Sequence, residues 1–335
     1  MRELQERLNK FRSLEASLDG IVIFNLGMNT PDSSQYDPNF FYFTNSTVNG
    51  IFYYDFSTST ILTNSRDFDD AKRSWADHVV LLDSFSDFIT SIKNKRIGVD
   101  RKNMLWRIYH RINRQVQCVD ISAQLQQTRS IKTPYEQRMI QHACQISKKV
   151  CEKFESEFSP SLTEFEFKGL IDFIMNKYGG IPAFSTIVAC GNNIRIPHDH
   201  PGNHKLTKPI LVDFGVRYKG YVSDVSRTWG SPYEPNILKV FDGVFPLIKP
   251  GVTGEQLHTK ACELLGKYEK HFNIALGHGI GIQVHENPVI SIGSREPLEP
   301  GMVFAIEPAI HVKNGIRIEH DILLTEKGFK NLTSF

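Results

Sequence analysis

Two aspartates lie inside apolar segments of the sequence, where a carboxylate without a partner would be costly to bury. Asp213 belongs to the run at 210–214, and Asp224 belongs to the run at 221–228. A turn at 218–219 would make these segments a hairpin with Asp213 and Asp224 directly opposed, their Cβ atoms about 5 Å apart. Two negative charges so close repel each other, and a bound divalent cation is the simplest compensation. The pair therefore favours a metal site over the alternative that one aspartate lies in a turn or at the surface.

A second hairpin is predicted further along the chain and carries two glutamates. Glu307 and Glu319 each lie in an apolar segment, and the Asn-Gly pair at 314–315 predicts the turn that joins these segments. A simple two-residue turn at this pair would place the two glutamates on opposite faces of the sheet. For both to reach one site, the loop must be odd in length or Pro308 must mark a bulge, and we predict one of these departures.

One histidine lies between glycines, in the run Leu-Gly-His-Gly-Ile-Gly around His278. The glycines let the backbone approach a site closely and leave the imidazole as the only functional group. A phosphate-binding loop has a similar composition, but no basic residue or helix start follows this one. With the four carboxylates, His278 makes five donors, more than one small cation needs. Two divalent cations that share carboxylates would use all five, and such a pair can generate a nucleophile from water at neutral pH.

Three residues near these donors could act on a substrate. His198 and His285 lie in loops, and a neutral imidazole beside a metal site can donate to a carbonyl or transfer a proton. Ordinary loop histidines are the alternative for both. Arg317 lies two residues before Glu319, so it shares the sheet face of that glutamate and could hold a carboxylate.

The elements that must position these residues fall into two regions. Short strands alternate with helices through residues 1–122, which predicts a small α/β accessory domain. Its strands are expected at 21–25, 51–56 and 96–100, and its helices at 67–75 and 83–93. Residues 123–132 are expected to connect this region to a second domain at 133–335.

The second domain is predicted to combine helices with antiparallel strands. Three capping boxes, in which Thr is followed three residues later by Glu or Gln, indicate where helices begin: Thr133, Thr163 and Thr253. Strands are expected at 185–189, 210–214, 221–228, 302–309 and 316–325. Helices grouped with long antiparallel strands are typical of an α+β layer and not of a doubly wound parallel sheet.

The composition excludes several classes of protein. The 335 residues include 39 Lys and Arg against 37 Asp and Glu, a net charge of +2, which gives no support to a nucleic-acid partner. The five cysteines form no C-x-x-C pair, which favours a reduced intracellular protein. No signal peptide or apolar run of membrane-spanning length is present. We therefore expect a cytoplasmic protein that binds neither nucleic acid nor membrane.

The five donors in this order resemble the dinuclear site of the "pita-bread" metallopeptidases, a family of methionine aminopeptidases, Xaa-Pro aminopeptidases, prolidases and the related creatinases. The resemblance extends over essentially all of residues 130–335. It implies a C-terminal α+β pita-bread domain of two pseudo-symmetric halves around two metal ions, with manganese expected and cobalt or zinc as alternatives. It also implies roles for individual residues: metal ligation by Asp213, Asp224, His278, Glu307 and Glu319, general-base action by Glu307, proton transfer by His198, and contact with the substrate carbonyl by His285.

The resemblance also narrows the substrate. Methionine aminopeptidases generally lack an N-terminal domain like residues 1–122, and creatinases have that domain but lack the metal ligands. The proline-specific branch is left, and Arg317 matches the arginine that these enzymes carry next to the last ligand. It implies an Xaa-Pro dipeptidase or an aminopeptidase acting on longer peptides, with a creatinase-type N-terminal domain and a homodimeric assembly. A binding module that has lost catalysis and a creatinase-like amidohydrolase are the alternatives, but no ligand is missing here.

Overall fold

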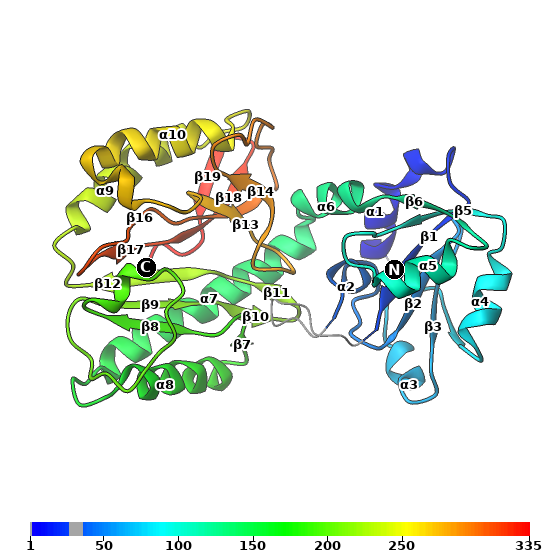
Figure 1. Cartoon of the computed structure of the whole chain (residues 1–335), viewed down its shortest axis with the longest axis horizontal. Helices are drawn as coiled ribbons and strands as arrows, with labels where there is room; N and C mark the ends of the chain where they lie inside the picture. Colours follow the sequence, from blue (N-terminus) through cyan, green and yellow to red (C-terminus); the bar gives the residue numbers. More distant parts are fainter. Residues whose placement is uncertain (1, 27–35) are drawn as a thin grey trace. The chain divides into compact units, whose positions relative to one another are not determined.

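The chain divides into two units, Met1–Arg129 and Ser130–Phe335. The structure is a computed structural model that describes residues 2–26 and 36–335 (Figure 1). The segment expected as a connection at 123–132 is mostly helix, because α6 (Ser122–Ser130) contains neither glycine nor proline to interrupt it. Among the described residues, no helix combines the length and apolar character needed to cross a membrane.

The N-terminal unit is built on one six-stranded mixed sheet with the order β4-β3-β2-β1-β5-β6. The strands are β1 (Gly20–Asn25), β2 (Gly50–Tyr54), β3 (Ser59–Thr63), β4 (His78–Leu81), β5 (Arg96–Val99) and β6 (Gln117–Asp120). The helices are α1 (Arg2–Asn9), α2 (Pro38–Thr44), α3 (Phe68–Ala71), α4 (Phe85–Ser91), α5 (Trp106–Ile112) and α6. The expected helix at 67–75 is only four residues long, and the Asp67 side chain makes no capping bond at its start.

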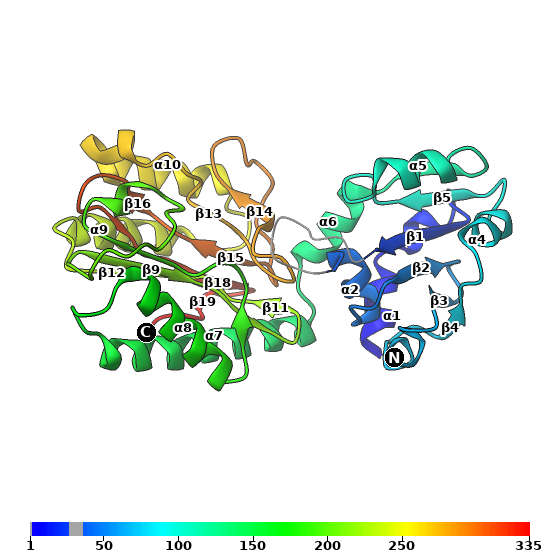
Figure 2. The same ribbon diagram turned by 60° about the horizontal axis from the view of Figure 1, so that its bottom comes forward.

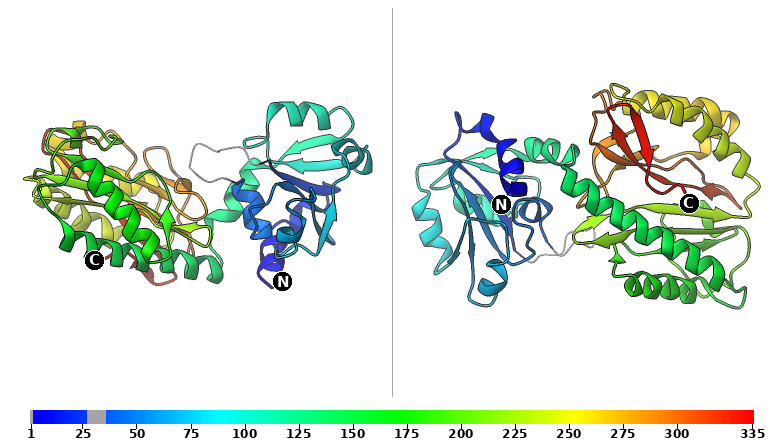
Figure 3. Two further views of the ribbon diagram at one scale, coloured as in Figure 1. Left: turned by 90° about the horizontal axis from the view of Figure 1, so that it is seen from below. Right: turned by 180° about the vertical axis from the view of Figure 1, so that it is seen from behind.

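The C-terminal unit has two halves, each with two helices packed on antiparallel strands (Figures 1 and 2). In the first half, α7 (Pro134–Glu157) and α8 (Glu164–Lys177) cover the sheet β12-β9-β8, as the view from behind in Figure 3 shows. Its strands are β8 (Ile187–Cys190), β9 (Ile210–Phe214) and β12 (Val225–Trp229), and a smaller sheet holds β7 (Ile181–Pro182), β10 (Val216–Tyr218) and β11 (Tyr221–Val222).

The second half repeats this arrangement with α9 (Glu234–Val244) and α10 (Gly254–Leu265), which share an apolar core with the sheet β14-β13-β15-β18-β19. The strands are β13 (Gly277–Gly279), β14 (Glu286–Ile290), β15 (Val303–Ile306), β18 (His320–Thr325) and β19 (Gly328–Asn331), with a separate hairpin of β16 (Ala309–Ile310) and β17 (Ile316–Arg317). All three predicted capping boxes are present. Helix α9 escaped prediction because Tyr233, at its N-cap, makes no side-chain capping bond.

The predicted register of the first hairpin is wrong by two residues. Asp213 is paired with Ser226 and not with Asp224. The turn is centred on Lys219 and Gly220, whose φ values of 47° and 86° suit the left-handed turn that matches strand twist. Because a shift of two residues preserves the face of a strand, Asp224 still lies on the same side as Asp213, diagonally along the hairpin.

The predicted departure in the second hairpin is confirmed as an odd-length loop. Ile306 pairs with His320, and Ala309 pairs with Arg317, so the pairing keeps one register across the interruption at Pro308. The connection at 311–315 therefore has an odd number of residues, and it brings Glu307 opposite Glu319.

Candidate metal centre

Three of the predicted ligands form a buried cluster in the C-terminal unit. One donor atom each from Asp224, His278 and Glu319 lies within 4.8 Å of the others. Asp224 stands at the break between β11 and β12, His278 lies in β13, and Glu319 stands at the break between β17 and β18. The backbone N–H of Glu319 donates to Ser226 O at 3.1 Å, which joins the two halves of the unit at this cluster.

Glu307 lies beside the same cluster. Its Oε1 is 3.6 Å from His278 Nε2, and Asp224 Oδ2 is 3.8 Å from that nitrogen. These separations are too long for hydrogen bonds. Two atoms that each lie about 2.1 Å from one metal ion are separated by roughly 3–4 Å, so the spacing suits donors that share an ion.

The fifth predicted ligand, Asp213, is held by an arginine. Arg317 Nη2 donates to Asp213 Oδ2 at 2.5 Å, and both side chains are buried. The other oxygen, Asp213 Oδ1, is buried and finds no hydrogen-bond partner in the part of the chain that the structure describes. A buried carboxylate oxygen without a partner is costly, and a cation would satisfy it.

Burial shifts the proton affinities of the cluster. It raises the pKa values of Asp224 and Glu319 well above their usual range, and the neighbouring carboxylates add to the rise. It also raises the pKa of Glu307 to about 7, although Arg317 opposes this. Burial lowers the pKa of His278 to about 3, so the imidazole is neutral and able to ligate. The cluster holds more carboxylates than buried cationic side chains, and divalent metal ions would neutralise the remaining charge. The donor types suit manganese, cobalt or zinc.

Arg317 links both hairpins through a serine that the sequence did not single out. Its Nε donates to Ser226 Oγ at 3.1 Å, and the Ser226 hydroxyl donates to Glu319 Oε2 at 3.0 Å. Its Nη1 donates to Pro197 O at 3.1 Å, next to His198. Arg317, predicted as a residue that could act on a substrate, holds Asp213 in the structure and also fastens the His198 loop.

The two predicted histidines of the rim differ in their surroundings. The ring centroid of His285 is 4.1 Å from that of His278, so His285 lies against the cluster. His198 is exposed, in the loop after a short 3-10 helix at Asn193–Arg195. A third histidine, His311, was missed; its pKa is lowered to about 4, first by burial and then by Arg317 and His198. Its place in the loop between the two glutamate-bearing strands was the only signal in the sequence.

Asp321 was also missed, although it supports a predicted ligand. Its Oδ2 accepts from the backbone N–H of Asp224 at 3.0 Å and from Cys144 Sγ at 3.4 Å. Burial raises the pKa of Asp321 to about 7. Only the alternation of residues after Glu319 hinted that this side chain points inward.

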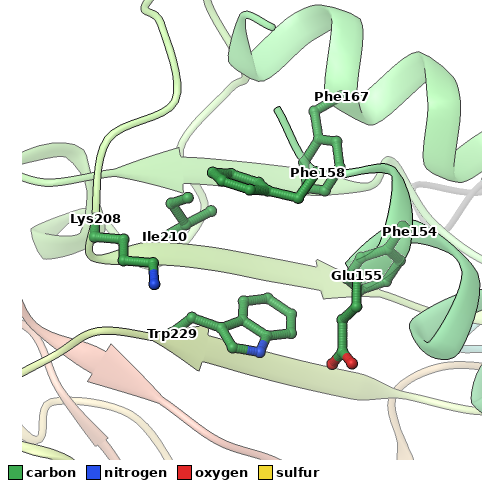
Figure 4. Close-up of a pocket in the computed structure, with 7 residues that line it drawn as sticks. All are labelled: Phe154, Glu155, Phe158, Phe167, Lys208, Ile210 and Trp229. Atoms are coloured by element: carbon green, nitrogen blue, oxygen red, sulfur yellow. The ribbon is translucent and has the colours of Figure 1, made fainter. Parts of the chain in front are cut away.

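A separate pocket of about 280 Å³ lies on the helix-covered side of the first sheet (Figure 4). Strand residues Ile210 and Trp229 line it together with side chains of the α7 and α8 region. Side chains along β9 point to alternate faces of the sheet, so Ile210 faces away from Asp213, three residues later. None of the five predicted ligands lines this pocket, which separates it from the metal cluster.

Comparisons with known proteins agree with this architecture. Residues 138–326, more than half of the chain, match the metallopeptidase family M24, and residues 7–131 match the creatinase/prolidase N-terminal domain. The chain is 29% identical to an Xaa-Pro dipeptidase of Pyrococcus furiosus over 99% of this chain and 98% of that protein.

Two solved structures have the same fold over nearly their whole length. The prolidase from Pyrococcus horikoshii OT3 has a TM-score of 0.88 at 25% identity and covers 100% of this chain and 98% of its own. The X-Pro aminopeptidase from Thermotoga maritima MSB8 has a TM-score of 0.85 at 28% identity, covering 95% of this chain and 96% of its own. The expected architecture, a pita-bread domain after a creatinase-type domain, is therefore confirmed, and the chain is a peptidase that belongs to metallopeptidase family M24.

Proposed function

We propose that five residues hold two divalent metal ions: Asp213, Asp224, His278, Glu307 and Glu319. The buried cluster of Asp224, His278 and Glu319 carries this proposal, since its donor atoms already converge. Two observations support it: Asp213 Oδ1 has no hydrogen-bond partner among the described residues, and burial raises the pKa of Glu307 to about 7. A cation would stabilise both carboxylates in their charged forms. Bound metal ions would supply Lewis-acid polarisation of a scissile carbonyl and would lower the pKa of water. We expect manganese at the site.

The protein's own groups would divide the remaining work. Glu307, which lies 3.6 Å from His278 in the buried cluster, would act as general base toward water besides ligating. His285, which lies against His278, would donate to the substrate carbonyl as negative charge develops on it. His198, exposed in its loop, can deliver a proton to the leaving amine. Arg317 would hold Asp213 in place for ligation.

We further propose that the bond cleaved lies between an N-terminal residue and a following proline, in an Xaa-Pro dipeptide. The match to the dipeptidase of Pyrococcus furiosus along nearly the whole chain supports this choice. An aminopeptidase acting on longer peptides is the alternative, which the likeness to the Thermotoga maritima enzyme supports. The homodimer and the cytoplasmic location stay predictions from the sequence.

Product analysis tests the proposal. The purified protein, stripped of metal and then loaded with manganese, cobalt or zinc in turn, is incubated with Xaa-Pro, Xaa-Ala and Xaa-Pro-Yaa peptides. We expect metal-dependent release of the N-terminal residue from Xaa-Pro and much slower release from Xaa-Ala. Faster cleavage of Xaa-Pro-Yaa would establish the aminopeptidase instead. Equal activity on Xaa-Ala, or activity that persists in chelator, would contradict the proposal.

A further inference from the structure

A buried ion pair stands next to His285. Lys132 Nζ lies 3.0 Å from Glu286 Oε1, and the two side chains are only 0% and 3% exposed. Among the Lys and Arg pairs with Asp or Glu in the described part of the chain, few are so completely removed from water; most join neighbours on helix surfaces. Full burial makes such a pair expensive in desolvation, and a hydrophobic pair of the same volume would often serve stability equally well. Its position therefore calls for a role beyond stability.

The Glu286 carboxylate is wrapped by the loop that carries His285. Its Oε2 accepts from the backbone N–H of Gln283 at 3.4 Å, and a Cβ at position 281 would collide with the same carboxylate. A side chain at 281 would therefore force the Glu286 carboxylate to move. The carboxylate spans the loop from 281 to 286 and fixes the path of the chain on both sides of His285.

Lys132 is itself held firmly where α7 begins. Its backbone N–H donates to Gly301 O at 3.0 Å, and its carbonyl accepts from Gln137 Nε2 at 2.9 Å. Its Nζ also donates to Ser130 O at 3.2 Å. The next residue, Thr133, is the N-cap of α7 and closes a complete capping box. The ammonium group therefore belongs to a rigid part of the fold and offers a fixed point to the loop.

The far side of the same loop is fastened to the first hairpin. Val222 N donates to Gly281 O at 2.8 Å, and Arg217 Nη1 donates to Ile282 O at 2.8 Å. Glu286 lies directly after His285, whose ring contacts His278. A shift of the 281–286 loop would therefore displace His285 more than it would displace the predicted metal ligands of the first hairpin.

We propose that Lys132 and Glu286 are positioning residues that hold His285 in its place beside His278. The proposal rests on the role of His285 in the proposed function. Neither residue touches the substrate; the pair restrains the loop so that the imidazole needs no reorganisation when the substrate arrives.

A mutational cycle on the full-length, metal-loaded protein tests this. Lys132→Met and Glu286→Gln are each expected to lower kcat on the order of 10- to 100-fold, as for groups that orient a catalytic side chain, with KM changed much less. Lys132→Arg should restore most of kcat. In the His285→Ala background the same substitutions should lower kcat by less than about twofold, because the group they position is gone. An undiminished loss in that background would overturn the proposal, since the pair would then act through something other than His285.

Loop order provides a second readout that does not depend on activity. Amide hydrogen exchange in the peptide covering 281–286, measured on the metal-free protein, should speed up in the double variant Lys132→Met/Glu286→Gln. This variant removes both charges, so it folds even where Lys132→Met leaves Glu286 uncompensated. Lys168→Met, which breaks the Lys168–Asp172 pair on α8, is the matched control and should leave this exchange unchanged.

The two readouts separate the two claims. A wild-type protein that cleaves no Xaa-Pro peptide would refute the proposed function, whereas faster loop exchange would still support the positioning role. Unchanged exchange in the double variant, together with unchanged kcat, would refute the positioning role in an active peptidase.

Discussion

The two hairpins that supply the carboxylates balance their charge differently. In the first, Asp213 is paired with Arg317 at 2.5 Å, and Asp224 lies diagonally along the same face. In the second, Glu307 and Glu319 lie directly opposite each other on the two strands. Glu319 accepts a hydrogen bond from the neutral hydroxyl of Ser226. Asp213 is thus partly compensated by a direct ion pair within the protein, whereas the weaker influence of Arg317 on Glu307 leaves the pKa of that glutamate raised to about 7. The glutamates should therefore respond more strongly to metal than Asp213 does.

Glu319→Gln should have the largest effect on activity. It keeps the size of the side chain and removes one of the charges that converge with Asp224 and His278. We expect turnover to fall by more than about 100-fold, which exceeds the loss that is usual when a residue that only supports a metal ligand is removed. The metal-free variant should melt at a higher temperature than the metal-free wild type, because one buried repulsion is gone. Turnover within tenfold of wild type, measured at saturating metal, would refute its assignment as a ligand.

Arg317→Met should have the largest effect on stability. It leaves the buried Asp213 carboxylate without its cation, which typically costs about 3–5 kcal/mol. Denaturant unfolding should show this loss in the metal-free protein and a smaller loss with metal bound, because metal would take over the compensation. Arg295→Met is the matched control: Arg295 is 81% exposed in its pair with Glu255, so the expected cost is within about 1 kcal/mol. Equal losses of stability in the two variants would show that the buried Arg317–Asp213 pair contributes no more than an exposed one.

Metal removal should lower stability by an intermediate amount. Ligand bound only by the folded state stabilises it by about 2.7 kcal/mol at a hundredfold excess over the dissociation constant. Chelation should therefore lower the melting temperature of the wild type clearly and that of Glu319→Gln much less. If neither chelator nor added metal changed the melting temperature of the wild type, the buried carboxylates would not depend on an added cation as proposed.

The smallest effect concerns pH and the loop of the second hairpin. Burial lowers the pKa of His311 to about 4, below its ordinary value of 6.5, with Arg317 and His198 adding to the shift. Because the unfolded chain takes up this proton more readily, the contribution to stability is complete above pH 6.5 and is lost as pH falls toward 4. His311→Asn should lessen the dependence of unfolding free energy on pH across this window. An identical slope in the variant and the wild type would rule out His311 as a source.

The sequence was sufficient for the features that depend on local chemistry. Threonine capping boxes predicted where three helices begin. The need to place Glu307 and Glu319 on one face of the sheet predicted a departure from a two-residue turn, and the loop between them is odd in length. The first register was missed because Tyr218, Lys219 and Gly220 allow two centres for one turn, and only the positive φ values at Lys219 and Gly220 decide between them.

Features that depend on long-range packing could not be predicted in the same way. Asp321 supports Asp224 across 97 positions of sequence, and Ser226 joins Arg317 to Glu319 between the two halves. Neither residue has a local motif, so only the packing of one half on the other discloses its role. The Lys132–Glu286 pair is of the same kind, since its partners meet only when the start of α7 lies beside the His285 loop.

Metal stoichiometry tests the central claim most directly. The purified wild type, loaded with manganese, freed of unbound metal and measured by elemental analysis, should hold close to two ions per chain, as five shared donors would require. Glu319→Gln, prepared in parallel, should hold fewer. A wild type that binds no more than one ion at saturation, or a variant that binds as much as the wild type, would contradict a dinuclear centre on these residues.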